Sequence, residues 1–259
     1  MKKILATIMV AALAGGAWGA GVVNSIHSDN AFGSIKVTGV ASNMYVAVPF
    51  EGFDGNARQA QDVVHPANLT VGTKLYVYDK AADKYDVFEV DENGRWKGAD
   101  KVTVNADGKA VFETADLERA VAVGTGALLE RKDTTQAVYV YGEIPTNRAA
   151  SVSFDAGQTL VSAPSTNAMT EVNLNAFTWS GVAAAASARL KTSGADYIQF
   201  RDASNNLIRY FYLADGSGWG LAPTQARKYP NLVADGKALI PAGTAFWYWS
   251  KNGGAQVTW

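Results

Sequence analysis

Histidine is the side chain best suited to acid–base chemistry near neutral pH, and this chain has only two, His27 and His65. A histidine metal site needs several ligands at close spacing, and the sequence around neither residue supplies such a set. A Ser-His-Asp triad is assembled in space, so spacing alone leaves one open. However, no Gly-x-Ser-x-Gly elbow occurs in the chain. We therefore interpret both histidines as loop residues.

Acidic residues gather around one expected hairpin: Asp79, Asp83, Asp86, Asp91 and Glu92. Paired carboxylates can hydrolyse glycosides, and converging oxygen ligands can hold calcium. These residues fall at turns and on the outward side of an alternating strand, where acidic side chains serve solubility. The matching places later in the chain carry Arg201, Asn206 and Arg209. The sequence therefore predicts no catalytic residue, no metal site and no cofactor, and the chain is not expected to be an enzyme.

Aromatic residues give the positive indication of a binding function, because tryptophan and tyrosine anchor interfaces and can stack on sugar rings. Trp247 and Trp249 alternate with Phe246 and Tyr248 in one strand pattern, so one pair faces a core. The other pair faces either the other half of the chain or solvent. The candidate ligand-binding residues are Trp179, Trp247 and Trp249.

The chain repeats itself, which explains much of its aromatic content. Trp96 and Trp219 each follow two alternating strands and a polar turn, at 74–96 and 197–219. The tryptophans are 123 residues apart, and further matches occur in the same order at offsets of 115, 122 and 118 residues; small loop insertions would produce this drift. Trp96 and Trp219 themselves are expected in the core, because large aromatics dominate burial in β-proteins.

Short alternating segments separated by turn residues predict an all-β fold. We expect two tandem, similar units, each a β-sandwich or partly open β-barrel of about seven short strands with little helix. The units span 33–142 and 148–259, joined by a linker at 143–147 where Pro145 interrupts the pattern. Short helical turns are expected at 56–64, 116–120 and 183–191.

The first residues match the pattern of an export signal. Lys2 and Lys3 are followed by an apolar run to Ala14 and a small-residue region, which is typical of a secretory signal peptide. We expect residues 1–19 to be removed and residues 20–32 to form a polar lead-in. The apolar run is shorter than the ~20 residues of a spanning helix. The mature protein is therefore expected in the periplasm or outside the cell.

The composition of the chain limits the classes of partner that it is expected to bind. Without Lys2 and Lys3, 21 basic residues face 24 acidic ones, a net charge of −3, which argues against nucleic acid. No later segment is apolar and long enough for a transmembrane helix. The chain has no cysteine, so its core must hold it together without disulfides.

Several turn-and-strand motifs are shared with a known group of proteins. They include Gly33-Ser-Ile-Lys-Val37, Tyr45-Val-Ala-Val-Pro49, Gly72-Thr-Lys-Leu-Tyr-Val-Tyr-Asp79, Gly94-Arg-Trp96 and Pro241-Ala-Gly-Thr-Ala-Phe-Trp247. With the signal peptide, they resemble duplicated, exported bacterial β-proteins of unassigned function. The resemblance covers most of the mature chain and implies a β-rich exported protein without known catalytic residues. The first unit departs from it at 123–129, which lack the proline of the second unit.

Three functions follow from these observations. The first is an exported, non-enzymatic structural, adhesive or surface-interaction protein whose partner is a protein or glycan surface. The second is a carbohydrate-binding module that uses exposed Trp and Tyr side chains. The third is an outer-membrane β-barrel, although the strands are shorter than the ~10 residues such barrels use.

Overall fold

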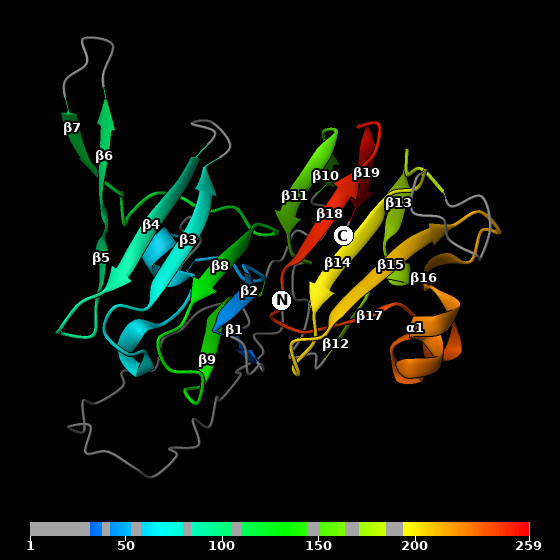
Figure 1. Cartoon of the computed structure of the whole chain (residues 1–259), viewed down its shortest axis with the longest axis horizontal. Coiled ribbons are helices and arrows are strands. Elements are labelled where there is room, and N and C mark those ends of the chain that lie inside the picture. The colour runs from blue at the N-terminus through cyan, green and yellow to red at the C-terminus, as the bar shows by residue number, and fades with distance from the viewer. Residues whose placement is uncertain are drawn as a thin grey trace, which may run out of the picture.

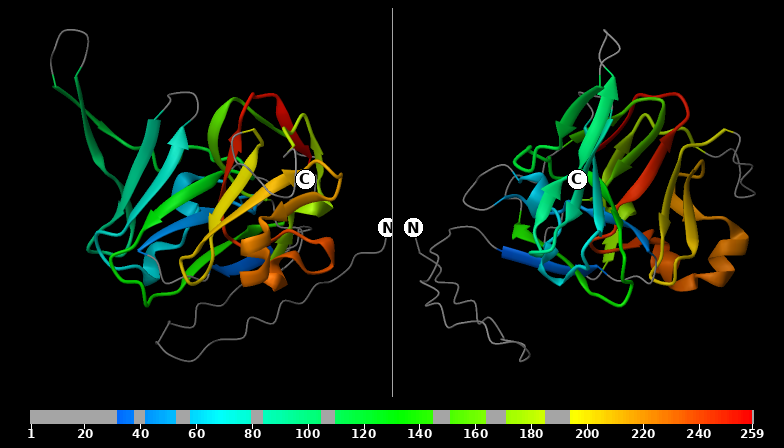
Figure 2. Two further views of the ribbon diagram at one scale, coloured as in Figure 1. Left: turned by 45° about the vertical axis from the view of Figure 1, so that its right-hand side comes forward. Right: turned by 60° about the vertical axis from the view of Figure 1, so that its left-hand side comes forward.

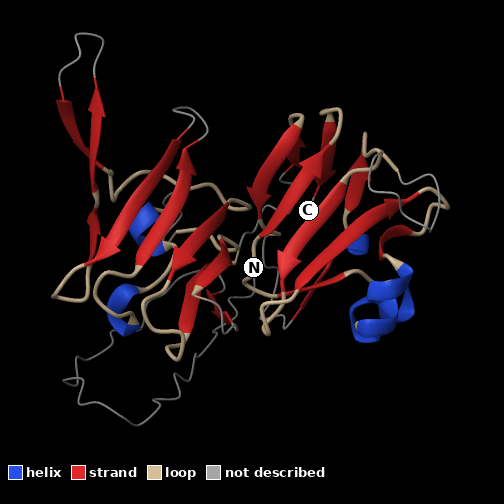
Figure 3. Cartoon of the chain, in the orientation of Figure 1, coloured by secondary structure: helices blue, strands red, loops and turns tan. Residues whose placement is uncertain are grey.

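The computed structural model describes residues 32–37, 42–52, 58–79, 84–104, 110–144, 151–163, 171–184 and 194–258. Antiparallel strands dominate these residues, so the predicted all-β class is confirmed (Figure 3). No described sheet closes on itself, and the layers pack as open, sandwich-like sheets. The expected signal peptide and most of the lead-in and linker lie outside the described residues.

The first half is built on a five-stranded sheet of order β2-β8-β3-β4-β5 (Figure 1). Its strands are β2 (Asn43–Ala47), β8 (Gly126–Glu130), β3 (Lys74–Asp79), β4 (Lys84–Val90) and β5 (Trp96–Gly98). Two smaller sheets accompany it: β1 (Phe32–Val37) with β9 (Val138–Glu143), and β6 (Asp100–Val104) with β7 (Ala110–Thr114). The β6–β7 hairpin projects from the body of the molecule in Figure 1.

The second half contains a five-stranded sheet of order β11-β18-β14-β15-β16. Its strands are β11 (Gly157–Val161), β18 (Phe246–Ser250), β14 (Tyr197–Arg201), β15 (Leu207–Leu213) and β16 (Gly218–Leu221). Smaller sheets are formed by β10 (Ser151–Phe154), β19 (Ala255–Thr258) and β13 (Thr178–Ser180), and by β12 (Glu171–Asn173) with β17 (Leu239–Pro241). The described part thus holds nine strands in the first half and ten in the second, more than the expected seven each.

The two large sheets share strand order, direction and register. In the first sheet, Leu129, Leu75 and Phe88 lie side by side on β8, β3 and β4. In the second, the corresponding row is Tyr248, Ile198 and Tyr210. One strand further, Trp96 lies opposite Val90 and Trp219 lies opposite Tyr212. Register therefore places the two tryptophans at corresponding positions, and both are buried, as predicted.

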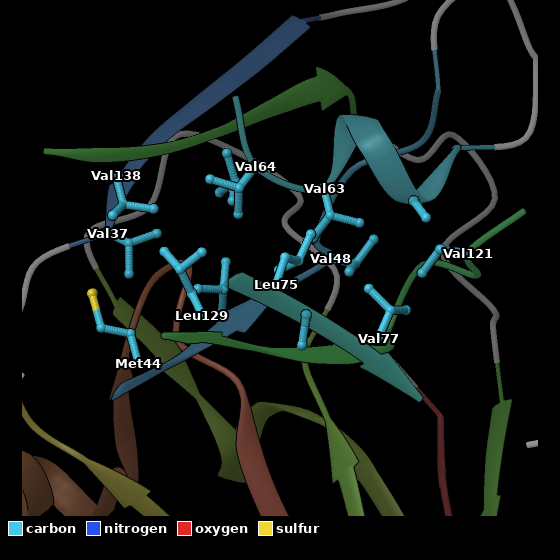
Figure 4. Packing of buried hydrophobic residues seen from close by; sticks show 14 of the residues in the cluster. Val37, Met44, Val48, Val63, Val64, Leu75, Val77, Val121, Leu129 and Val138 are labelled. Carbon is cyan, nitrogen blue, oxygen red and sulfur yellow. The ribbon is translucent and has the colours of Figure 1, made fainter. Parts of the chain in front are cut away.

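Each half has its own core on one side of its large sheet. Alternation sends every second side chain inward. Figure 4 shows this packing in the first half, where Leu75, Val77 and Leu129 meet Val48 and Val63. In the second half the core is more aromatic, because Phe154, Phe200, Phe246, Tyr210 and Tyr248 fill it together with Trp219.

A seam with a reciprocal bonding pattern joins the two sheets. The N–H of Ala47 donates to the carbonyl of Gly243 at 2.8 Å, and the N–H of Ser162 donates to the carbonyl of Gly124 at 2.7 Å. Isolated bridges pair Val46 with Thr244 and Thr125 with Val161. The end of β2 thus contacts the turn before β18, and the end of β11 contacts the turn before β8. Figure 2 shows the two halves lying side by side.

The helical segments do not all lie where the sequence predicted them. Two helical segments that the pattern did not predict follow β16: α1 (Pro223–Lys228) and the 3₁₀ helix η5 (Pro230–Gly236). Short 3₁₀ turns also occur as η2 (Ala60–Asp62), η3 (Pro66–Asn68) and η4 (Leu174–Ala176). Residues 116–120 hold one turn, in which the N–H of Arg119 donates to the carbonyl of Asp116. The turn η2 lies within the segment 56–64 where helix was expected. The expected helix at 183–191 falls mostly outside the described residues.

Candidate functional site

The side of the second sheet that faces away from its core is the candidate site. The outer face is defined by the outward residues of β11, β14, β15, β16 and β18: Gln158, Leu160, Tyr197, Gln199, Arg201, Leu207, Arg209, Phe211, Leu213, Gly218, Gly220, Trp247 and Trp249. Their neighbours along each strand, such as Ile198, Tyr210 and Tyr248, point into the core. Strand alternation alone therefore separates this face from the core.

A stack of two rings and a guanidinium occupies the middle of the outer face. Trp249 and Tyr197 are directly opposite each other on β18 and β14, with ring centroids 5.1 Å apart and planes inclined by 17°. The Cζ atom of Arg209, on β15, lies 4.4 Å from the centroid of the Tyr197 ring. Because β14 runs between β18 and β15, Trp249 and Arg209 cover Tyr197 from opposite sides. Such pairs are attractive and orient the groups.

Arg209 has spare hydrogen-bonding capacity. Its Nη2 donates to Oε1 of Gln199 at 2.6 Å, across the register pair that β14 and β15 form. Its Nε is buried and has no hydrogen-bond partner among the described residues. A guanidinium carries five N–H donors. Within the described ranges, no carboxylate forms an ion pair with Arg209.

Trp247 lies at the edge of this face, where the two halves meet. Its ring contacts Tyr45 of β2 edge to face, with centroids 6.0 Å apart and planes at 87°. Tyr45 is an outward residue of the first sheet, next to the seam. Trp247 is half-buried in this position. It therefore joins the outer faces of the two sheets, which is the inter-unit alternative of the sequence analysis.

Trp179 lies on the other side of the second sheet. Its indole stacks near Tyr248, with centroids 5.8 Å apart and planes at 14°, and its Nε1 donates to the carbonyl of Leu174 at 2.8 Å. Phe154 lies against it as well. The structure thus brings Trp247 and Trp249 to one face and places Trp179 against the core on the opposite face.

A buried carboxylate fixes the end of β18 that carries Trp249. Asp196 is 1 % exposed and accepts a hydrogen bond from the Tyr248 hydroxyl at 2.6 Å. It also accepts from the backbone N–H of Lys251 at 2.8 Å and of Ala183 at 3.2 Å. Burial and the Asp196 carboxylate raise the pKa of Tyr248 above its usual value. The residues on either side of Trp249 are therefore anchored, which holds its ring in place.

Among the described residues that sequence patterns marked for other chemistry, His65, Asp86 and Asp91 have structural roles. His65 is exposed, and its Nδ1 accepts from the N–H of Ala67 at 3.2 Å at the start of η3. His27 lies outside the described residues. Asp86 lies on the core side of β4, opposite Val77, and pairs with Arg119 at 2.6 Å, so its predicted place on the outward side is wrong. Asp91 accepts from the N–H groups of Asn93 and Arg95 within its turn. Those turn bonds lower the pKa of Asp91.

No described group of three or more His, Asp or Glu residues is placed to hold a metal ion. None of the described helices has the length and apolar character needed to cross a bilayer. No family model, curated protein or solved structure matches this chain. The site is therefore interpreted from its own geometry.

Tyr197, Gln199 and Arg209 are site residues that sequence reasoning did not select. The signal that could have found them is their alternation with core residues: Tyr197 and Gln199 flank Ile198 on β14, and Arg209 lies between Ile208 and Tyr210 on β15. Alternation shows on which face of its strand a residue lies. The register of β14 with β18 is needed to place Tyr197 next to Trp249, which comes 52 residues later in the sequence. That register comes from the fold.

Proposed function

We propose that this chain is an exported, non-enzymatic surface-interaction protein that binds a protein partner through the outer face. The observation that carries the proposal is the stack of Trp249, Tyr197 and Arg209. Tryptophan, tyrosine and arginine are the residues most enriched among interface hot spots. Here all three are held in fixed positions by strand register, which lowers the entropic cost of binding.

The ring geometry favours a protein partner over a glycan. A sugar stacks on the open face of an aromatic ring. Both faces of Tyr197 are covered, one by Trp249 and one by Arg209. Trp247 meets Tyr45 edge to face, and Trp179 packs against the core. The three tryptophans therefore do not form the continuous flat platform that a carbohydrate-binding module would use.

A displayed random-peptide library, panned against the purified protein, tests this function. We expect peptides that bind the protein and lose about tenfold or more in affinity on Trp249→Ala. The matched control is Glu130→Ala, because Glu130 occupies the corresponding place in the first sheet. Circular dichroism would check that both variants fold. Absence of binding peptides, or peptides that ignore Trp249→Ala, would contradict the proposal.

Export is part of the same proposal, and residues 1–19 support it by their pattern. Expression in a bacterium followed by fractionation should recover the protein outside the cytoplasm. Its new N-terminus is expected at Ala20. A cytoplasmic protein that keeps Met1–Gly19 would contradict export.

We also propose that the two halves are tandem copies joined at 143–147. Shared strand order and the reciprocal seam support this, since an interface in which two copies exchange the same contacts is typical of paired identical units. A protease site inserted at 145–150 should give a nicked chain whose halves stay associated through the seam. Separation of the halves on nicking would contradict it.

A further inference from the structure

The outer face has an unbalanced positive charge. Its outward residues include Arg201 and Arg209, and none of them is acidic. Lys251 follows Trp249 by two residues and is exposed. The nearby Asp196 is buried and already accepts three hydrogen bonds. Asp202 is held by its own turn, where it accepts from Ser204 and Asn206. Among the described residues, no carboxylate forms an ion pair with Arg201, Arg209 or Lys251.

The second half as a whole also carries a net positive charge. Residues 148–259 contain nine basic and six acidic residues, whereas residues 33–142 contain twelve basic and sixteen acidic residues. The formal charges are thus +3 and −4. Charge of one sign on one part of a protein attracts partners of the opposite sign and speeds their encounter.

The geometry of Arg209 indicates how such a partner would bind. Its Nε is buried, and its Nη2 is directed to Gln199. No described residue accepts a hydrogen bond from Nη1. A carboxylate would therefore approach the guanidinium end-on, through Nη1, while Tyr197 covers one of its flat sides. Hydrogen bonds between arginine and a carboxylate are short and strong because both groups are charged.

We propose that the partner of the outer face is an acidic polypeptide segment, in which an Asp or Glu side chain pairs with Arg209 and a neighbouring apolar side chain packs on Trp249. This inference rests on the proposed function and adds the chemistry of the partner to it. It predicts that the binding is weakened by salt, because the attraction between the basic face and the acidic segment is screened.

The peptide selection described above, repeated with a second pair of variants, tests the inference. The enriched peptides should contain Asp or Glu, and Arg209→Gln should weaken them about tenfold or more. Lys97→Gln is the matched control, because it removes one outward positive charge from the first sheet. Arg209→Lys should give an intermediate affinity, since it keeps the charge without the planar fork. Thermal unfolding would check that each variant folds.

The outcomes separate the inference from the function. Neutral peptides that are sensitive to Trp249→Ala but not to Arg209→Gln would overturn the acidic partner and leave the binding face intact. Peptides that ignore both variants would overturn both proposals. Glycan-array binding that is lost on Trp249→Ala, without any peptide binding, would overturn a polypeptide partner. Dimers in sedimentation that dissociate on Trp249→Ala and persist on Arg209→Gln would assign the face to a second copy instead.

Discussion

The two large sheets follow the same chain path, but their outward side chains differ in chemical character. Across β8, β3, β4 and β5 the outward row reads Glu130, Lys74, Glu89 and Lys97. Across β18, β14, β15 and β16 the corresponding row reads Trp249, Tyr197, Phe211 and Gly220. One row alternates in charge and contains an ion pair between Lys97 and Glu89, and the other has three aromatic residues followed by a glycine. Core-facing positions set the fold in both sheets, so the outward positions were free to differ.

The comparison extends to the two buried tryptophans. Nε1 of Trp96 donates to the carbonyl of Val64 at 2.8 Å. Nε1 of Trp219 is buried and has no hydrogen-bond acceptor among the described residues. Instead, Trp219 meets Trp179, Tyr212 and Tyr248 edge to face, with centroids 5.0 to 6.0 Å apart. The first core holds its tryptophan with a hydrogen bond, and the second holds it with ring faces.

The largest expected effects are at these two positions. Trp96→Ala and Trp219→Ala should each lower the free energy of unfolding by ~3–5 kcal/mol, because each leaves a large cavity in a core. The Phe variants sharpen the comparison. Trp96→Phe leaves the Val64 carbonyl unpaired and should cost ~1–3 kcal/mol more than Trp219→Phe. Urea denaturation measures both, and equal losses for the two Phe variants would contradict the distinction.

The second prediction uses the phenol of Tyr248, which is buried in the second core, whereas the described core residues of the first half include no tyrosine. Burial and Asp196 raise the pKa of Tyr248 above 10.0, so the folded state keeps a proton that the unfolded state loses in alkali. Stability should therefore fall as pH rises above about 10, by ~1.4 kcal/mol per pH unit for one such group. The corresponding residue in the first sheet is Leu129, which does not titrate.

Tyr248→Phe provides the control for this pH dependence. Denaturation of the protein and the variant at several pH values should give a smaller alkaline slope for the variant. Tyr210 contributes to the remaining slope, because burial raises its pKa as well. An unchanged slope in Tyr248→Phe would show that other groups cause the alkaline loss.

Sequence patterns predicted the parts of this fold that depend on local alternation. They identified the alternation in β3, β4 and β18 and the burial of both repeated tryptophans. They missed α1, since six residues beginning at Pro223 carry no periodic apolar stripe. They grouped Trp179 with Trp247 and Trp249, because the contacts that place it against Phe154 and Tyr248 join distant segments. Register between distant strands is the information that local patterns lack.

The third prediction compares the centres of the two outward rows. Tyr197→Ala should lower the free energy of unfolding by ~1–3 kcal/mol, because it removes contacts with Trp249, Phe211 and Arg209. Lys74→Ala, at the corresponding place, should cost less than ~1 kcal/mol, as is usual for partly exposed charges. Chemical denaturation of both variants makes the comparison. A larger loss for Lys74→Ala would mean that the charged row is the more important of the two.

The smallest expected effects distinguish how each row is held together. Lys97 and Glu89 are 3.9 Å apart at their charged atoms, and the Lys97 side chain is 57 % exposed. A double-mutant cycle on this pair should give a coupling of ~0–0.5 kcal/mol that disappears at high salt. The same cycle on Arg209 and Tyr197, with Arg209→Gln and Tyr197→Leu, should give ~0.5–1 kcal/mol. This coupling should persist in salt, because the guanidinium lies against the ring and mobile ions cannot enter between them. Equal salt sensitivity of the two couplings would indicate that Arg209 acts as an ordinary surface charge.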